Sequence, residues 1–325
     1  MKKKLIFAAL VIVAVVILAV AAGIGYLKLA LPNVGPAIDI KVDMSPDHVE
    51  RGKYLANHVA VCIDCHSTRD WTHFSGPVVE GTFGKGGQPF GHNEGFPGDF
   101  YSRNLTPAHL KTWTDGEIFR AVTSGVSKDG TALFPVMPYH YYGQADQADI
   151  LDIIAYLRTL PPIENDVPAS RADFPMSLII NTIPSKPSFS QRPNSTDTVA
   201  YGKYLVNMAS CMECHTQDNK GTLLMDKAYA GGRGFVMPGG VLRSSNITPD
   251  QTTGIGNWTE SAFLDRFRAY AQASALQAVP PNEFNTIMPW NMYAGMTDED
   301  LKAIFAYLRT VTPVQNRVTV FTKTN

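Results

Sequence analysis

The sequence repeats itself once, and the centre of the repeat is a short cysteine pattern. Cys-x-x-Cys-His occurs at 62–66 and again at 211–215, and these two copies use all four cysteines of the chain. Further segments before and after each copy of the pattern match in the same order: 52–57 with 202–207, 104–107 with 246–249, 113–114 with 258–259, 137–138 with 288–289, and 155–159 with 306–310. Such a repeat predicts two copies of one domain, at 45–160 and 197–325.

The cysteine pattern itself predicts covalent haem. Two thiols on one helical turn can add across the two vinyl groups of a haem, and the adjacent histidine then reaches the iron. A lone Cys-x-x-Cys also suits thioredoxin-like redox chemistry or zinc. However, both copies carry the histidine, and no further ligand pairs at zinc spacing follow. We therefore expect two haem c groups, attached at Cys62, Cys65, Cys211 and Cys214 and ligated by His66 and His215.

The second axial ligand is expected to be methionine. Met137 and Met288 occupy the same position of the repeat, and each is followed by proline, which stiffens the loop that presents the sulfur. A thioether is a soft ligand suited to haem iron. Alternative ligands are His73, His92 and His140 in the first domain, and Met237, Met292 and Met296 in the second.

Several other polar residues are ambiguous. Arg103 and Arg243 flank the repeated Asn-x-Thr-Pro segments and are candidates for pairing with haem propionates. The repeated Trp113 and Trp258 either hydrogen-bond a haem propionate through the indole N–H or have a structural role. The remaining histidines, 48, 58 and 109, show no partner pattern and are expected to be structural.

Each domain is expected to be mostly helical, so the fold class is all-α. Ser45 and Pro46 open a helix that runs towards Cys62, and the apolar spacing from 147 to 159 predicts a last helix that Pro161 ends. In the second domain Thr297 begins the corresponding helix. Gly52 and Gly202 would let the first and last helices approach closely. The glycine-rich stretches 81–98 and 231–240 show few strand signals and are expected to be loops.

The first thirty residues predict a membrane anchor. Lys2, Lys3 and Lys4 precede an uncharged apolar run at 5–27, which is long enough to span a bilayer. The basic cluster keeps the N-terminus in the cytoplasm, so the rest of the chain is exported. A cleaved signal is the alternative, because small residues lie near the end of the run. The formal net charge of −1 does not indicate a nucleic-acid-binding protein.

A proline-rich linker is expected at 161–196, between the two domains. Inside it, the segment 176–180 is apolar. It is expected to be a strand or turn packed between the domains; the other interpretation is a second contact with the membrane, although five residues are too few to span it.

These motifs give the chain a family resemblance. Each domain resembles a class I cytochrome c. The stretches 113–117, 133–139, 245–250 and 253–259 are similar to the cytochrome c subunits of membrane-bound alcohol and gluconate dehydrogenases. The resemblance covers 45–325 and implies the axial pairs His66 with Met137 and His215 with Met288. It also implies electron transfer from a periplasmic dehydrogenase towards a quinone or terminal oxidase of the inner membrane, with no substrate bond made or broken.

Two departures from that family leave other functions open. Its subunits typically carry three haems and are held to the membrane differently, whereas this chain offers two haem sites and an N-terminal span. A di-haem subunit of a haem-copper oxidase or another respiratory complex is therefore an alternative. A di-haem peroxidase is a weaker one, because it needs a displaceable ligand and both domains carry the Met-Pro loop. A thiosulfate-oxidising enzyme would need a cysteine ligand that the chain cannot spare.

Overall fold

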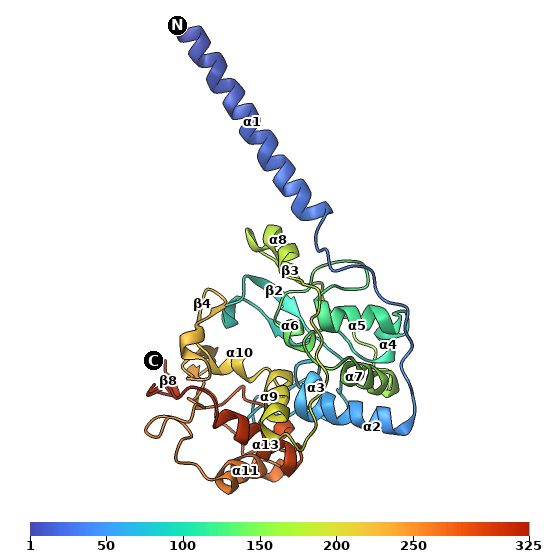
Figure 1. Ribbon diagram of the computed structural model, residues 1–325, viewed down its shortest axis with the longest axis vertical. Helices are drawn as coiled ribbons and strands as arrows, with labels where there is room; N and C mark the ends of the chain where they lie inside the picture. The colour runs from blue at the N-terminus through green and yellow to red at the C-terminus, as the bar shows by residue number, and fades with distance from the viewer. Residues whose placement is uncertain (325) are drawn as a thin grey trace.

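The computed structural model describes residues 1–324 and consists mainly of helices. Helix α1 (Lys2–Leu29) stands away from the globular part (Figure 1), and none of its residues is buried. By length and composition it is the one helix within residues 1–324 that could cross a membrane. The predicted apolar helix at the N-terminus is therefore confirmed.

The globular part has two halves with similar helices, which we call the first half (45–173) and the second half (197–324). The first half contains α2 (Pro46–Tyr54), the π-helical turn η1 (Leu55–Val59), α3 (Cys62–Cys65), the 3-10 turn η2 (His92–Glu94), α4 (Pro107–Leu110), α5 (Asp115–Ser124), α6 (Tyr139–Tyr142) and α7 (Gln147–Thr159). The second half contains α9 (Thr198–Met208), α10 (Cys211–His215), η4 (Met225–Lys227), α11 (Glu260–Arg268), η5 (Ala273–Ala275), α12 (Trp290–Tyr293) and α13 (Asp298–Leu308).

The predicted helix boundaries agree with the structure where caps set them. Pro46 is the first residue of α2, and the helical turn η1 continues it towards Cys62. The Asp146 side chain accepts a hydrogen bond from Ala148 N and begins α7, which ends at Thr159 as predicted. Thr297 caps α13 by accepting from Asp300 N at 3.1 Å. The starts of α7 and α13 depend on local side chain–backbone bonds, whereas Pro46 begins α2 without a side-chain cap.

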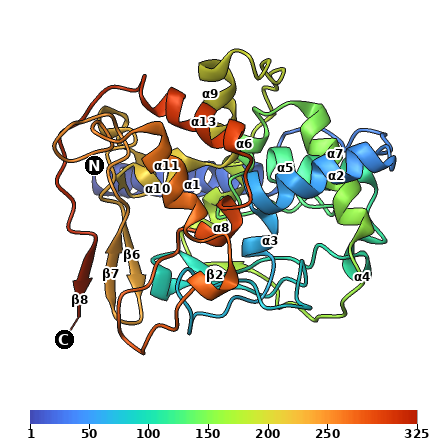
Figure 2. The ribbon, with the colours of Figure 1, turned by 90° about the horizontal axis from the view of Figure 1, so that it is seen from below.

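Short strands are present where the sequence predicted only loops, so that prediction was incomplete. They form three antiparallel sheets: β1 (Pro89–Phe90), β2 (Gly98–Tyr101) and β3 (Arg171–Ala172); β4 (Asp218–Asn219) and β5 (Thr222–Leu223); and β6 (Gly234–Met237), β7 (Gly240–Arg243) and β8 (Phe321–Lys323). In Figure 2 the β6–β7 hairpin and β8 lie at the opposite end of the molecule from α2 and α7. Strands of two to four residues are too short to show an alternating pattern.

Glycine permits the closest strand contacts in both halves. Gly98 pairs with Ala172 and has φ +145°, and an added Cβ would lie 2.3 Å from the Arg171 carbonyl oxygen. Gly240 pairs with Lys323, has φ +155°, and its Cβ would lie 2.2 Å from the Thr322 oxygen. Neither the backbone angle nor the space admits a side chain. The segment after each last helix therefore returns to pair with a glycine strand of its own half.

The first and last helices of each half cross at a glycine. At Gly52 of α2 an added Cβ would lie 1.7 Å from the Asp152 carbonyl oxygen of α7, and at Gly202 of α9 it would lie 1.8 Å from the Ala303 oxygen of α13. The predicted close approach is thus confirmed. The buried side chains of both halves, including Leu55, Ile153, Leu205 and Leu301, join in one apolar core.

Substituting alanine for Gly52 should destabilise the protein by about 1–3 kcal/mol or more, because the two helix backbones must separate to admit the methyl group. Thermal unfolding followed by circular dichroism measures this. Gly234→Ala is the control, since a Cβ there would meet Val241 Cγ1 at an ordinary 3.5 Å. Equal melting temperatures for Gly52→Ala and wild type would contradict the crossing.

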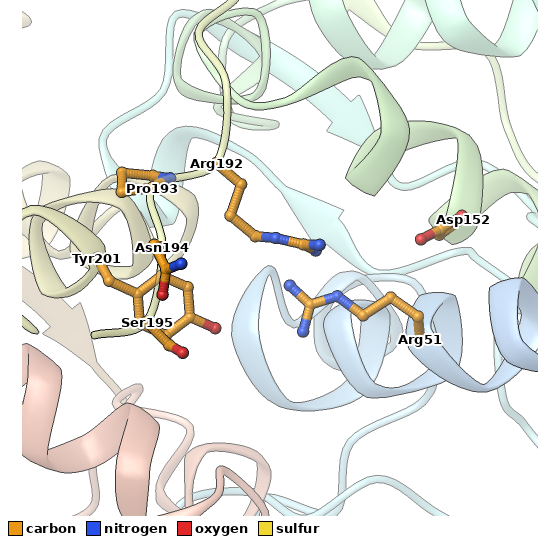
Figure 3. A pocket seen from close by; sticks show the side chains of 7 residues that line it. All are labelled: Arg51, Asp152, Arg192, Pro193, Asn194, Ser195 and Tyr201. Carbon is orange, nitrogen blue, oxygen red and sulfur yellow. The ribbon is translucent and has the colours of Figure 1, made fainter. Parts of the chain in front are cut away.

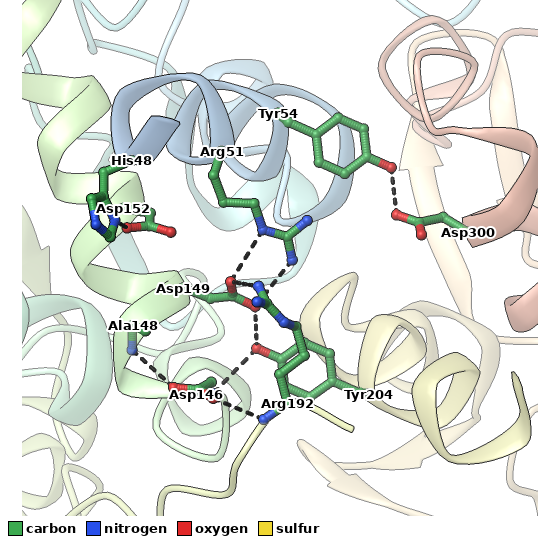
Figure 4. A network of polar contacts seen from close by, with 10 residues as sticks. All are labelled: His48, Arg51, Tyr54, Asp146, Ala148, Asp149, Asp152, Arg192, Tyr204 and Asp300. Carbon is green, nitrogen blue, oxygen red and sulfur yellow. Dashed lines mark hydrogen bonds and ion pairs between the residues drawn. The ribbon is translucent and has the colours of Figure 1, made fainter. Parts of the chain in front are cut away.

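The two halves exchange matching contacts across their boundary (Figure 4). Tyr54 of α2 donates to Asp300 Oδ2 of α13 at 2.5 Å, and Tyr204 of α9 donates to Asp149 Oδ2 of α7 at 2.6 Å. Burial, and then the negative charge of the facing carboxylate, raises the pKa of both tyrosines, so each hydroxyl stays protonated and donates. The first helix of each half therefore contacts the last helix of the other half. This is the symmetric pattern of an isologous dimer interface.

Asp149 binds more polar partners than Asp300 does. It is fully buried and also binds Arg51 and Arg192, through Oδ1 at 3.2 and 2.5 Å. A cavity of about 560 Å³ adjoins these two arginines (Figure 3), and its other lining residues are Asp152, Pro193, Asn194, Ser195 and Tyr201. None of the predicted haem-binding residues lines it.

Candidate haem centres

Each Cys-x-x-Cys-His segment is one helical turn that begins after a residue in the left-handed conformation. Val61 (φ +47°) precedes α3, and Ser210 (φ +52°) precedes α10. A positive φ is rare for a β-branched residue such as valine and tends to occur at functional sites. His66 N donates to Cys62 O at 3.0 Å, which closes the first turn.

All four cysteines are free thiols in a crowded environment. Cys65 and Cys214 keep exposed surface, yet many protein atoms surround all four sulfurs. This desolvation raises the pKa of each thiol, to about 12 for Cys62, Cys65 and Cys211 and to about 11 for Cys214. None of the four cysteines forms a disulfide within residues 1–324, so all four are available for thioether bonds. Within residues 1–324 no group of three or more His, Cys, Asp and Glu side chains gathers in a way that could hold a metal ion.

The two histidines are oriented alike. His66 Nδ1–H donates to the Arg103 carbonyl at 2.6 Å, and His215 Nδ1–H donates to the Ser245 carbonyl at 2.8 Å. A carbonyl only accepts, so Nε2 is the bare nitrogen in both rings and is free to bind iron. Burial lowers the pKa of both rings, which favours the neutral form that a metal requires. The residues present fit a haem iron at both positions.

The two methionines precede the same tight turn. Pro138 has φ −80° and ψ +54°, and Pro289 has φ −81° and ψ +65°. Tyr139 N donates to Met137 O and Trp290 N donates to Met288 O, both at 2.8 Å. These are inverse γ-turns, which the fixed φ of proline favours. Both methionine side chains are half-buried against the core.

A tyrosine after each turn connects the methionine loop to the cysteine segment. Tyr142 Oη donates to Ala60 O, and Tyr293 Oη donates to Ala209 O, both at 3.1 Å. Ala60 and Ala209 lie two residues before the first cysteine of each segment. The fold therefore brings the helix that follows each Met-Pro loop onto the residues that precede each cysteine turn.

The alternative axial ligands and the two candidate arginines contact other groups of the protein. His73 contacts Asp70 at 2.8 Å, His92 contacts Asp173 at 2.6 Å, and His140 lies 3.8 Å from Glu213. Met292 and Met296 are buried in the core, and Met237 lies on β6. Arg103 and Arg243 donate to the returning segments, at Pro168 O and Thr322 Oγ1.

Sequence reasoning missed an ion pair in each cysteine segment. Asp64 binds Arg69 at 2.9 Å, and Glu213 binds Arg233 at 3.0 Å. Both acids precede the second cysteine, so their equivalent repeat positions were a usable signal. Arg69 is almost fully buried and also stacks on Trp71, 4.2 Å from the ring centroid. These pairs connect the cysteine turns to the loops that follow them.

Sequence reasoning also missed that the first half supports the Met288 loop. Ser75, which is fully buried, donates through Oγ to Met288 O at 2.6 Å and accepts from Trp290 N at 3.0 Å. Asn285 accepts from Ser75 N at 2.9 Å. No sequence pattern connects residue 75 with residue 288, because this contact exists only once the halves pack.

Comparison with known proteins identifies the family. The cytochrome c family matches residues 199–312. The fructose dehydrogenase cytochrome subunit of Gluconobacter japonicus is 30% identical over 277 residues, which are 81% of this chain and 52% of that protein. The gluconate 2-dehydrogenase cytochrome c subunit of Pantoea cypripedii is 28% identical over 85% of this chain and 62% of that protein.

A diheme cytochrome c-type protein of Cereibacter sphaeroides is 30% identical over 67% of this chain and 73% of that protein. The chain spans only about half to three fifths of the length of the dehydrogenase subunits that it matches. The resemblance predicted from the motifs is confirmed. This chain belongs to the haem c-binding, electron-carrying family that comprises diheme cytochromes c and the cytochrome c subunits of fructose, alcohol and gluconate dehydrogenases.

Proposed function

We propose that this chain is a membrane-anchored di-haem cytochrome c that passes electrons between a periplasmic dehydrogenase and the membrane respiratory chain. The observation that carries the proposal is the duplicated histidine geometry. His66 and His215 each donate through Nδ1 to a carbonyl of a following loop and so present a bare Nε2 at the end of a Cys-x-x-Cys turn.

The equivalence of the halves supports haem binding in the first as well as the second. The family match covers the second half. The first half reproduces its left-handed residue before the cysteines, its Met-Pro turn, its tyrosine–carbonyl bond and its helix crossing. Asn104 also accepts from Thr106 N and donates to Ile163 O, as Asn246 does with Thr248 N and Val314 O. Two class I cytochrome c domains in tandem explain this agreement.

We place the end of the first domain at about residue 173 rather than 160. Residues 161–173 return along the first half: Asn165 donates to Lys85 O, and β3 pairs with β2. Asn316 and β8 make the corresponding contacts in the second half. The connection proper is then 174–196, between domains 45–173 and 197–325.

The haems would be attached at Cys62, Cys65, Cys211 and Cys214, with axial pairs His66–Met137 and His215–Met288. Each haem supplies a one-electron ferric–ferrous couple. The chain's own residues fix the ring nitrogen through the carbonyl bond, hold the methionine on a proline turn and surround the site with apolar side chains. Methionine ligation and a water-poor site both favour the reduced iron and raise the potential.

Haem counting tests the proposal directly. The pyridine haemochrome assay should return two equivalents per chain for wild type and one for Cys62→Ala/Cys65→Ala. Cys211→Ala/Cys214→Ala is the matched variant and should also return one. Two equivalents in the Cys62→Ala/Cys65→Ala variant, or one in wild type, would refute the assignment.

The proposed location is the inner membrane, with α1 as a single uncleaved span and the haem domains in the periplasm. The exposed apolar surface of α1 between its terminal lysines supports this, since a helix of this length and composition can span a bilayer. The dehydrogenase names of the longer relatives support a dehydrogenase as the electron donor.

A second candidate function is an electron-carrying subunit of another respiratory complex. The diheme cytochrome c-type relative, of which this chain covers 73%, supports keeping it as a candidate, because that name specifies two haems and no dehydrogenase. Purification from detergent-solubilised membranes distinguishes the two. A co-purifying dehydrogenase supports the first function, and a co-purifying oxidase supports the second.

A further inference from the structure

We propose that residues 174–183 form a second, shallow contact with the lipid bilayer, beside the point where α1 leaves it. This inference rests on the proposed anchoring by α1. The segment contains α8 (Met176–Ile179) and the 3-10 turn η3 (Ile180–Thr182). It does not pack between the two halves as the sequence analysis expected. Instead, α8 and η3 both contact α1, and α8 lies beside its end (Figure 1).

A hydrogen bond fixes this segment to α1. Asn181 Nδ2 donates to the Leu27 carbonyl at 3.0 Å. Leu27 is in the last turn of α1, where carbonyls have no partner within the helix. The bond therefore gives the Leu27 carbonyl a donor at the end of the proposed membrane span. At this point the backbone passes from the apolar core of the bilayer into the polar interface. The position of 174–183 along α1 is thus set by the structure.

The surface of the segment is uncharged and adjoins α1. Residues 174–185 carry no charge. The side chains of Phe174 and Ile179 are 79% and 43% exposed, and Leu29 at the end of α1 is 89% exposed. A single exposed apolar residue is common on soluble proteins, but a patch that adjoins a spanning helix has lipid as its neighbour.

The backbone of the segment is suited to the interface. Ser177 N donates to Asp173 O at 2.7 Å, Leu178 N to Pro175 O at 2.9 Å, and Ile183 N to Ile180 O at 3.2 Å. These donors are paired within the segment, so placing it at the acyl boundary leaves few unsatisfied groups. The exposed residues Arg171 and Lys186 lie on its two sides, where they could meet lipid headgroups, and the adjacent Asp173 contacts His92 Nε2 at 2.6 Å.

A second contact would restrict the orientation of the haem domains. Residues 30–45 connect α1 to α2 without helix or strand, and Val42 N donates to Asp115 Oδ2 at 3.0 Å, which fixes the end of this connection to the first half. A single span would then attach the globular part to the membrane through residues 30–45 alone. Two attachment points, at α1 and at 174–183, would hold the same face of the molecule towards the membrane.

Photolabelling of the full-length holoprotein in nanodiscs tests the inference. The probe is a phospholipid with a diazirine at the upper end of its acyl chain, and labelled peptides are mapped by mass spectrometry. We expect label in α1 and in 174–183, and none around Met225 and Val236, which are 61% and 59% exposed in the second half. Label in α1 but not in 174–183 would overturn this inference alone. Absence of label from both would overturn the anchoring itself.

Substitution at the patch completes the test. Phe174→Asp should reduce labelling of 174–183 by roughly fivefold or more, because a carboxylate is disfavoured at the acyl boundary. Labelling of α1 should stay unchanged. Met225→Asp is the matched control, and unaltered haem absorption shows that each variant is folded. Equal labelling of 174–183 in wild type and Phe174→Asp would contradict a lipid contact through this side chain.

Discussion

Replacing Met137 by histidine is expected to lower the midpoint potential of one haem by on the order of 0.1 V, within the roughly 0.8 V range that axial ligands span. The thioether stabilises ferrous iron, whereas a second imidazole favours the ferric state. A potentiometric titration followed in the visible spectrum should show one shifted and one unshifted transition. The near-infrared sulfur-to-ferric band should lose about half of its intensity, because one of two thioether ligands is gone.

The equivalent substitution and an exposed methionine provide the controls. Met288→His should shift the other transition, and the double variant should shift both and abolish the band. Met225→His places the same side chain at a 61% exposed position outside the proposed ligand set, so both potentials should be unchanged. Unchanged potentials and an intact band in Met137→His would show that another residue, such as His140, ligates the first haem.

Removing the Asp149 carboxylate should destabilise the folded protein by about 3–5 kcal/mol, the typical result of deleting one partner of a buried ion pair. Asp149→Ala leaves Arg51, Arg192 and the Tyr204 hydroxyl facing a site without negative charge. These groups join α2, α7 and the connecting segment to α9 of the second half. Urea unfolding followed by circular dichroism measures the loss.

Asp300 is the matched control, because it occupies the equivalent position of the repeat. Its carboxylate accepts from Tyr54 and is not bound by the two arginines. Asp300→Ala should therefore cost about 1–3 kcal/mol, the penalty for leaving one hydroxyl without its acceptor. Equal losses for the two variants would show that the arginine pairs add nothing to stability.

Sequence reasoning succeeded where local chemistry fixes the outcome. The start of α2 at Pro46, the extent of α7 from the apolar spacing of 147–159 and the cap of α13 at Thr297 were predicted, because each depends only on residues close along the chain. The family followed from the resemblance of local stretches, such as 113–117, 133–139 and 245–259, to known cytochrome c subunits. Gly52 and Gly202 were correctly interpreted as crossing points because the repeat placed both on the first helix.

Sequence reasoning failed where a contact joins residues that lie far apart along the chain. In and beside the glycine-rich stretches, β2 and β7 pair with the neighbouring strands β1 and β6, and β3 and β8 join them from more than seventy residues away. The segment 176–180 lies against α1 because of a contact with Leu27, which no local pattern encodes. The predicted haem ligands remain predictions, and the duplicated histidine geometry is the structural support for them.

The sequence by itself determined the family, the helix ends and the residues suited to hold haem, because covalent attachment and capping depend on residues that are close along the chain. The tertiary structure alone decided how the halves differ. Asp149 and Asp300 are equivalent in the repeat, yet two arginines bind only the first. Ser75 supports the Met288 loop from the other half. Burial and the docking of distant surfaces set these environments, and a linear pattern contains neither.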